Sequence, residues 1–251
     1  ACPGVTIAVP PSAPERPTTP MLQLLDNISH KDLRVITERG AAWGDNVMSA
    51  PVTPDEFRSL QADYPILFQP DGSGSFLPVA LFGLEQGDNL FLSAKGWDAD
   101  YLPLSMQRMP FSIGIAGEEL RIMVDMDSPR ISRGAEGEAL FLPQGGLTDH
   151  LEQVNSVLRT LHEGLQALPE FVQALTAHEL LESFVLDVER PDGSHGRLEG
   201  FYMINEERLA ALSADTIGLL HQADYLQPIY MAIASLSNLT KLIRRHLART
   251  A

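Results

Sequence analysis

The stretch 65-PILFQPDGSGSFLPVALFGLEQGDNLFL-92 decides the fold class, because it alternates short apolar runs with turn-forming residues. The apolar runs cover residues 65–68, 78–84 and 89–92, and Gly, Asp, Asn and Ser separate them. Short runs bounded by such residues are typical of β-strands. The sequence therefore predicts three strands here, with residues 86–88 as the hairpin turn between the second and the third.

More strands are predicted on either side of this stretch. Residues 111–115 and 120–125 are predicted to pair through a Gly-containing turn, and residues 139–142 add a further strand. Residues 184–188 and 198–204 flank a turn-rich segment, which predicts a hairpin. A short helix over about 54–62 precedes all of them, because Thr53 is a good N-cap and proline follows at the first helical position.

Helices dominate the second half of the sequence. An amphipathic stripe at i, i+3 or i+4 spacing comprises Leu147, Leu151, Val154, Leu158, Leu161 and Leu165. Pro169 is expected to end this helix, and a shorter helical pattern follows at 171–181. Asn205 and Ser213 are N-cap residues for two more helices, and a last helix is predicted from about 228 to 247.

Strands that cluster early and helices that cluster late predict an α+β fold rather than alternating βαβ units. We expect an N-terminal antiparallel β-rich part packed with a mainly helical C-terminal half that contains one β-hairpin. Residues 21–251 are expected to form a single domain. Residues 1–20 hold six prolines and are interpreted as a flexible Pro-rich leader, native or added.

The composition limits the partners and the compartment. A net charge of −15 repels phosphate backbones, so nucleic acid is an unfavourable partner. No apolar run approaches the roughly 20 residues that span a bilayer, so no membrane insertion is expected. The single cysteine, Cys2, forms no internal disulfide, and no signal peptide is visible, which favours a cytoplasmic location unless a leader precedes Ala1. The oligomeric state stays open.

An ordered series of short motifs resembles the SapC-like family of bacterial proteins over about residues 22–247. Trp97, Tyr101 with Pro103, and Arg108 with 110–111 are similar to that family's W…Y-x-P…R-x-x-P-F segment, although Met109 departs from its usual residue. The other matching segments are 30–34, 56–57, 63–68, 78–84, 89–92, 198–202, Leu209 and the helix carrying Tyr230, Ser235 and Leu236.

The resemblance implies a role but no reaction. It suggests a non-enzymatic accessory or binding protein of a surface-layer or TonB-linked nutrient-uptake system, with a protein or peptide partner. It implies no catalytic residue and no cofactor. The leader through residue 20 has no counterpart in the family.

The segment with Trp97, Tyr101, Arg108 and Phe111 is the best candidate for a contact site. Aromatic side chains near a cation, in a loop flanked by prolines, are typical of a surface that binds a peptide or a ligand. The alternative is that the aromatic residues pack in the core and that Arg108 forms an internal ion pair.

His30 and Asp32 form an alternative metal site. A His-x-Asp pair is half of the two-histidine, one-carboxylate site of non-haem iron oxygenases, and His195 with Arg197 is a conceivable distal half. The pair precedes every predicted strand, whereas that enzyme fold places it after the first strands, so local capping or ion pairing is the competing interpretation. The alternative function is therefore an oxygenase-like or other modifying enzyme. The chain contains no common phosphate-binding, zinc-protease or serine-hydrolase motif.

Overall fold

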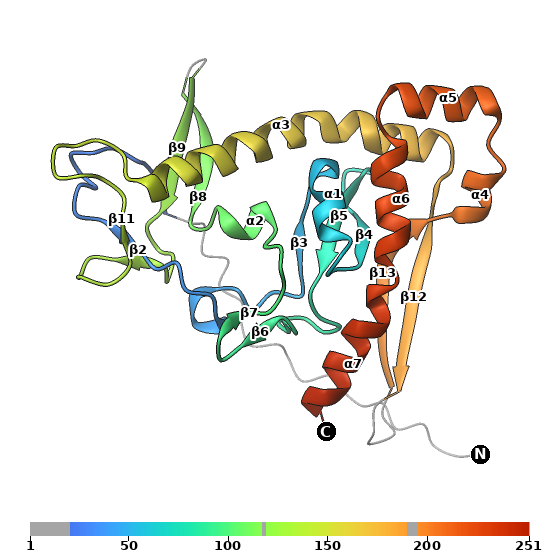
Figure 1. Cartoon of the computed structure of the whole chain (residues 1–251), viewed down its shortest axis with the longest axis horizontal. Helices are drawn as coiled ribbons and strands as arrows, with labels where there is room; N and C mark the ends of the chain where they lie inside the picture. Colours follow the sequence, from blue (N-terminus) through green and yellow to red (C-terminus); the bar gives the residue numbers. More distant parts are fainter. Residues whose placement is uncertain (1–20, 117–118, 190–194, 251) are drawn as a thin grey trace, which may run out of the picture.

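A computed structural model describes residues 21–116, 119–189 and 195–250 (Figure 1). Antiparallel sheets occupy most of the N-terminal half and helices most of the C-terminal half, which confirms the predicted α+β class. The predicted leader, residues 1–20, lies outside the described residues. No described helix is both long enough and apolar enough to cross a membrane.

The largest sheet has five strands that come from both halves of the chain. Its order is β12 (Leu181–Glu189), β13 (His195–Ile204), β4 (Ile66–Pro70), β5 (Phe76–Leu81) and β3 (Ser49–Pro51), and all neighbours are antiparallel. The predicted hairpin is confirmed as β12 and β13. It joins the N-terminal strands through the pairing of Tyr202 with Phe68.

A second sheet has the order β1 (Leu22–Leu24), β9 (Glu119–Asp125) and β8 (Phe111–Ala116), which confirms the predicted 111–125 strand pair. Two smaller sheets are built from β10 (Ile131–Ser132), β2 (Arg34–Val35) and β11 (Glu138–Ala139), and from β6 (Leu92–Ser93) with β7 (Gly96–Trp97). Strands β3 and β8 each lie at the end of their sheet.

The predicted strand at 89–92 is wrong in all but its last residue. The chain does turn at residues 85–88, but β5 pairs with β4 and β3, and only Leu92 enters a strand, β6, which pairs with β7. Leu90 and Phe91 are consecutive and both buried. A strand points successive side chains to opposite faces, so this apolar run packs as a turn inside the core rather than as a strand.

Helix α3 (Asp149–Ala177) runs unbroken through Pro169, so the predicted interruption is wrong. Its N-cap is Thr148, whose hydroxyl accepts a hydrogen bond from the backbone N–H of Leu151. Pro169 removes one N–H, whose acceptor in a regular helix is the carbonyl of Leu165, and the Leu165 side chain is half exposed. Pro169 itself is exposed, so its ring lies on the surface of the helix and not in a packed core.

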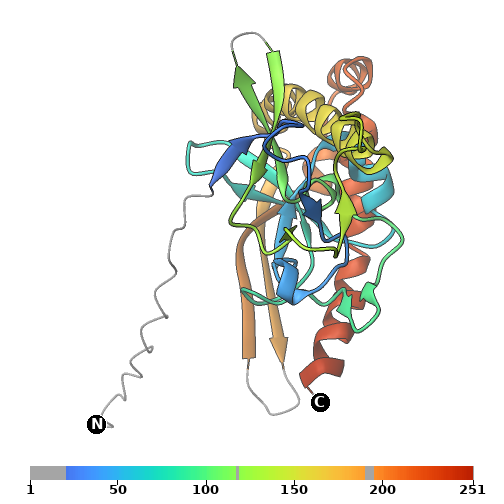
Figure 2. The same ribbon diagram turned by 90° about the vertical axis from the view of Figure 1, so that its left-hand side faces the viewer.

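The remaining helices are short. The structure contains η1 (Ala41–Trp43), η2 (Pro54–Glu56), α1 (Phe57–Leu60), α2 (Leu104–Gln107), α4 (Glu206–Ala210), α5 (Ala214–Gln222), α6 (Leu226–Ser235) and α7 (Asn238–Thr250). The predicted caps Asn205 and Ser213 are confirmed. Helices α6 and α7 lie alongside the β12–β13 hairpin in both views (Figures 1 and 2).

The predicted last helix is two helices, α6 and α7, and buried polar side chains at their junction explain the break. Ser235 Oγ accepts a hydrogen bond from the backbone N–H of Ile66 at 2.8 Å, and Asn238 Nδ2 donates to the carbonyl of Gln61 at 2.8 Å. Both side chains are buried. These bonds hold the junction against the N-terminal segment that leads into β4.

Two apolar cores lie under helix α3, which at about 1.5 Å per residue is roughly 44 Å long. The larger core is formed by the five-stranded sheet, α1, α6 and the C-terminal part of α3. The smaller core lies between the N-terminal part of α3 and the β8–β9 pair. One long helix therefore fixes both sheets with respect to each other.

Replacement of Gly164 by alanine tests how closely α3 packs on the segment before α1. A Cβ atom at Gly164 would lie 2.8 Å from Cβ of Thr53, and these atoms have little freedom to move apart. We expect Gly164→Ala to lower the free energy of unfolding by about 1–3 kcal/mol. In Gly218→Ala, on α5, the new methyl group meets nothing within 4 Å. Because alanine favours a helix over glycine, we expect this change to raise the free energy of unfolding by roughly 0.5–1 kcal/mol. Urea denaturation measures both, and equal shifts would contradict the packing argument.

Candidate ligand-binding groove

A groove of about 650 Å³ lies where the two sheet ends meet helices α2 and α3. Figure 1 shows α2 below α3 and between β8 and β3. The lining residues come from β3 and the segments before and after it, from β5, from α2 and the residues after it, from β8 and from α3. They are Gly44, Val47, Ser49, Ala50, Pro51, Val52, Thr53, Leu77, Ser105, Met106, Arg108, Met109, Ser112, Ile113, Leu158, Leu161, His162 and Leu165.

Most of the lining is apolar. Helix α3 contributes Leu158, Leu161 and Leu165, which belong to the stripe that the sequence predicts as a core face. The stripe does not end in the core, because Leu165 is 50% exposed whereas Leu158 and Leu161 are buried. An apolar stripe that continues past the core into an open groove is typical of a surface that binds something apolar.

Arg108 is the one arginine in the lining, and it directly follows α2. Its Nη1 donates a hydrogen bond to the carbonyl of Phe111 at 2.6 Å. Among the described residues no carboxylate lies within ion-pair distance of its guanidinium. Burial lowers the pKa of Arg108, because a charged group loses water there, but an arginine stays protonated near neutral pH.

Hydroxyl groups and the imidazole of His162 supply the other polar side-chain atoms of the groove. Ser49, Thr53, Ser105 and Ser112 all line it. The Oγ atom of Ser105 is inaccessible to solvent and has no hydrogen-bond partner within the described ranges. Buried polar atoms in proteins nearly always have a partner. Ser105 therefore has hydrogen-bonding capacity that no described residue uses.

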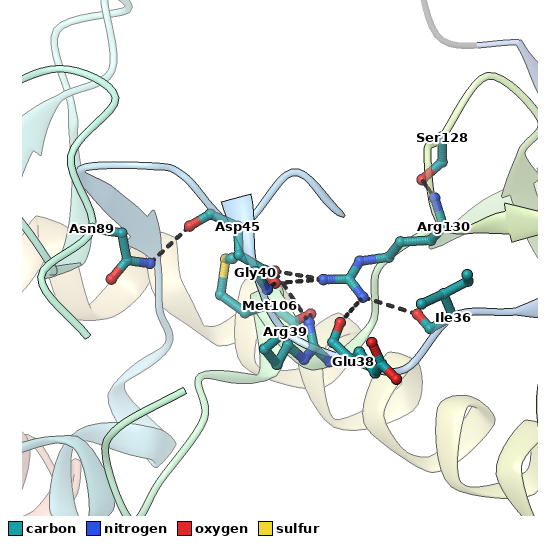
Figure 3. Close-up of polar contacts among 9 residues, drawn as sticks. All are labelled: Ile36, Glu38, Arg39, Gly40, Asp45, Asn89, Met106, Ser128 and Arg130. Carbon is teal, nitrogen blue, oxygen red and sulfur yellow. Dashed lines mark hydrogen bonds and ion pairs between the residues drawn. The ribbon is translucent and has the colours of Figure 1, made fainter. Parts of the chain in front are cut away.

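Asp45 and Arg130 form a buried ion cluster next to α2, which was not predicted from the sequence (Figure 3). Arg130 Nη2 donates to both carboxylate oxygens of Asp45 at 2.7 Å, and its Nη1 donates to the carbonyls of Ile36 and Glu38 at 2.9 and 2.8 Å. Both charged side chains are only 1% exposed. A carboxylate and a guanidinium buried together need such close, hydrogen-bonded contacts to offset their lost hydration.

Arg39 connects this cluster to the groove wall. Its Nη1 lies 3.4 Å from Asp45 Oδ1 and donates to the carbonyl of Met106, a groove residue on α2, at 2.9 Å. Burial, and then the nearby charge of Arg130, lower the pKa of Arg39, while Asp45 opposes the change. Asp45 thus fixes two arginines, one of which holds the last turn of α2 in place (Figure 3).

Glu56 fixes the other end of α2. Its Oε1 accepts hydrogen bonds from the backbone N–H of Leu104 at 2.8 Å and from Tyr101 Oη at 3.2 Å, and its Oε2 accepts from the backbone N–H of Thr53 at 3.2 Å. Burial raises the pKa of Glu56, and these hydrogen bonds oppose the change. The short helix that carries the groove's arginine is therefore held at both ends by buried charged groups.

Three of the four predicted contact residues pack inside the protein. Trp97 stacks on Phe91 and donates its indole N–H to Tyr64 Oη at 2.7 Å. Tyr101 is partly buried and bonds to Glu56, and Phe111 is 0% exposed. Of the four, Arg108 alone lines the groove, and no described carboxylate gives it the internal ion pair of the alternative interpretation.

His30 and Asp32 do not converge on one site. His30 is buried, and its Nδ1 accepts from the backbone N–H of Asp26 at 3.3 Å while its Nε2 lies 3.2 Å from Gln23 Oε1. The Asp32 side chain is 88% exposed and lies 3.9 Å from Lys31 Nζ. In residues 21–116, 119–189 and 195–250 no three His, Cys, Asp or Glu residues are grouped as a metal site requires. The arrangement agrees with the local capping interpretation.

Of the comparisons with known proteins, the one with family models gives a match, and this match covers most of the chain. A family model described as SapC matches residues 25–242. No curated protein and no solved structure matches the chain. The match includes the groove, the buried ion cluster and most of both cores. With most of its length matched, the chain belongs to the SapC family.

Proposed function

We propose that this protein is a non-enzymatic accessory protein that binds a small apolar ligand in the groove beside Arg108. The observation that carries the proposal is the groove itself. Its volume of about 650 Å³ and its mostly apolar lining with a few polar groups are those of small-molecule sites, which range from about 300 to 1,000 Å³.

The chemistry of the lining supports binding rather than catalysis. Groups that transfer protons or attack a substrate occur in active sites as hydrogen-bonded sets, such as a nucleophile with its base. Here Ser105 Oγ has no described partner, and the imidazole of His162 lies 3.0 Å from the amide Nε2 of Gln166 rather than near a serine. The groove offers contacts and one positive charge.

The wider role follows from the family resemblance and stays a prediction. Within it, the protein serves a bacterial surface-layer or nutrient-uptake system from the cytoplasm, in contact with a protein or peptide partner. The enzyme alternative requires an iron site at His30 and Asp32, and the hydrogen bonds of His30 give it no support.

A neutral fluorescent probe tests the groove. N-phenyl-1-naphthylamine brightens in apolar sites, and we expect the wild-type protein to bind it. Leu165→Glu places a charge at the exposed edge of the groove. We expect it to weaken binding of the probe about tenfold or more, because burial of a leucine-sized apolar surface contributes roughly 1.5–3 kcal/mol.

The matched control is Leu219→Glu, which makes the same change on α5, outside the groove, at a leucine that is 64% exposed. We expect it to bind the probe as the wild type does. Circular dichroism shows whether both variants are folded. A wild-type protein that does not bind the probe, or equal affinities in the two variants, would contradict the proposed site.

A further inference from the structure

The unpaired guanidinium in the groove identifies the chemical class of the ligand. We propose that the ligand is an apolar acid of the fatty-acid class, which lies along the apolar lining and pairs its carboxylate with Arg108. This inference rests on the proposed function, because it concerns the same groove.

Charge complementarity is the first argument. The chain has 33 acidic and 18 basic residues, so carboxylates outnumber cations in it. Within the described ranges, carboxylates pair with other arginines, among them Arg39, Arg130, Arg197, Arg208, Arg245 and Arg249. Arg108 is partly buried and has no such partner in the described part of the chain. An arginine that loses water without gaining a carboxylate is poised to receive one from a ligand.

The hydrogen bonds of Arg108 leave the right donors free. Nη1 donates to the carbonyl of Phe111, whereas no described residue accepts from Nε or Nη2. These two nitrogens form one side of the planar guanidinium, and a carboxylate pairs with such a side through two parallel hydrogen bonds. The carbonyl of Phe111 holds the guanidinium in place and leaves that side available.

Ser105 adds a second polar contact. It lies three residues before Arg108, so the two side chains are neighbours at the same face of α2. Both line the groove, and Ser105 Oγ has no partner among the described residues. Because this Oγ atom is inaccessible to solvent, the Ser105 side chain has to turn toward the groove before it can donate to a carboxylate oxygen beside Arg108.

The apolar lining determines the rest of the ligand. Leu77 from β5, Ile113 from β8 and the α3 leucines surround the groove, and they offer an alkyl chain contact area but no hydrogen bonds. A peptide would bring backbone N–H and C=O groups that need partners in the groove. The few hydroxyl groups there do not supply one for every peptide group, which favours an alkyl chain over a peptide.

Competition with the fluorescent probe tests the acid. Decanoate and 1-decanol have the same chain length and differ in the charged head. We expect decanoate to displace the probe from the wild-type protein at about a tenfold to hundredfold lower concentration than 1-decanol, which is the usual gain of a hydrogen-bonded charge pair. In Arg108→Gln this preference should disappear while 1-decanol binds as before.

Two further variants act as controls. Arg159→Gln removes the same charge from an exposed position on α3 that does not line the groove, and it should keep the preference for decanoate. Arg108→Lys keeps the charge but not the two parallel donors, so we expect a reduced preference. His162→Gln tests whether the other basic side chain of the lining contributes to binding, and we expect this variant to keep the preference for decanoate.

Each outcome decides between the two proposals. Equal binding of decanoate and 1-decanol, both weakened by Leu165→Glu, would contradict the proposal of an acidic ligand and still support the apolar groove. Loss of the preference in His162→Gln but not in Arg108→Gln would also overturn it. If an apolar peptide with a free C-terminus binds through Arg108 and decanoate does not, the ligand is a peptide and the inference is wrong. Failure of every probe to bind would overturn both proposals.

Discussion

Arg130→Met is expected to lower the free energy of unfolding by about 3–5 kcal/mol, the usual cost of breaking a buried ion pair. The variant leaves the carboxylate of Asp45, which is 1% exposed, with one arginine 3.4 Å away. It also removes the donors to the carbonyls of Ile36 and Glu38. Methionine fills a similar volume, so the loss measures the polar contacts rather than a cavity. Urea denaturation at neutral pH gives the value.

Arg197→Met is the matched control. Arg197 also pairs with a carboxylate, that of Glu199 at 3.0 Å, but its side chain is 60% exposed. Exposed ion pairs contribute about 1 kcal/mol or less, so a small change is expected. A loss in Arg130→Met no larger than that in Arg197→Met would show that the buried cluster does not stabilise the fold.

The double variant Arg130→Met with Asp45→Asn isolates the pair itself. It removes the carboxylate that the single change leaves buried, so the two losses should not add, and we expect a coupling energy of about 1–3 kcal/mol. The same double variant also tests the link to the groove, because Arg39 contacts both Asp45 and the carbonyl of Met106. We expect it to weaken probe binding as well as stability, whereas Arg197→Met leaves binding unchanged.

Local patterns explain why the fold class was predictable. The strands β4, β5, β8, β9, β12 and β13 coincide with apolar runs between turn residues, and the caps Thr53, Asn205 and Ser213 act within one helical turn. Such signals depend on neighbours in the sequence. They fail at Pro169, where α3 continues through a residue that usually ends a helix, and at Ser235, where bonds to a distant segment end α6.

Local sequence patterns do not predict the groove or the ion cluster. Asp45 and Arg130 are 85 residues apart, and neither stands in a motif. The groove needs β3, β8, α2 and α3 together, and the sequence does not say how these elements meet. It did provide two signals: the α3 stripe that extends to Leu165, and Arg108 beside aromatic residues. Only the folded chain separates Arg108, which lines the groove, from Phe111, which does not.

Phe111→Ala is expected to lower the free energy of unfolding by about 3–5 kcal/mol, the usual cost of removing a buried aromatic side chain. Phe111 is 0% exposed and belongs to the smaller core, with Val124, Leu140 and Leu158 around it. The loss of its ring leaves a cavity under the N-terminal part of α3. Thermal or urea denaturation measures the change, and Tyr230→Ala, at a half-exposed aromatic side chain, should change stability by less than about 0.5 kcal/mol.

Binding separates the role of Phe111 from that of Arg108. If Phe111 only supports the core, the folded Phe111→Ala protein still selects decanoate over 1-decanol at low temperature, where the variant stays native. Arg108→Gln should show the reverse, with nearly normal stability and no selection, because Arg108 lines the groove and its guanidinium makes a single hydrogen bond within the described residues. A folded Phe111→Ala protein that no longer prefers decanoate over 1-decanol would show that Phe111 contributes to ligand binding. The two residues are three positions apart, so this pair of variants tests directly which side of the segment faces the ligand.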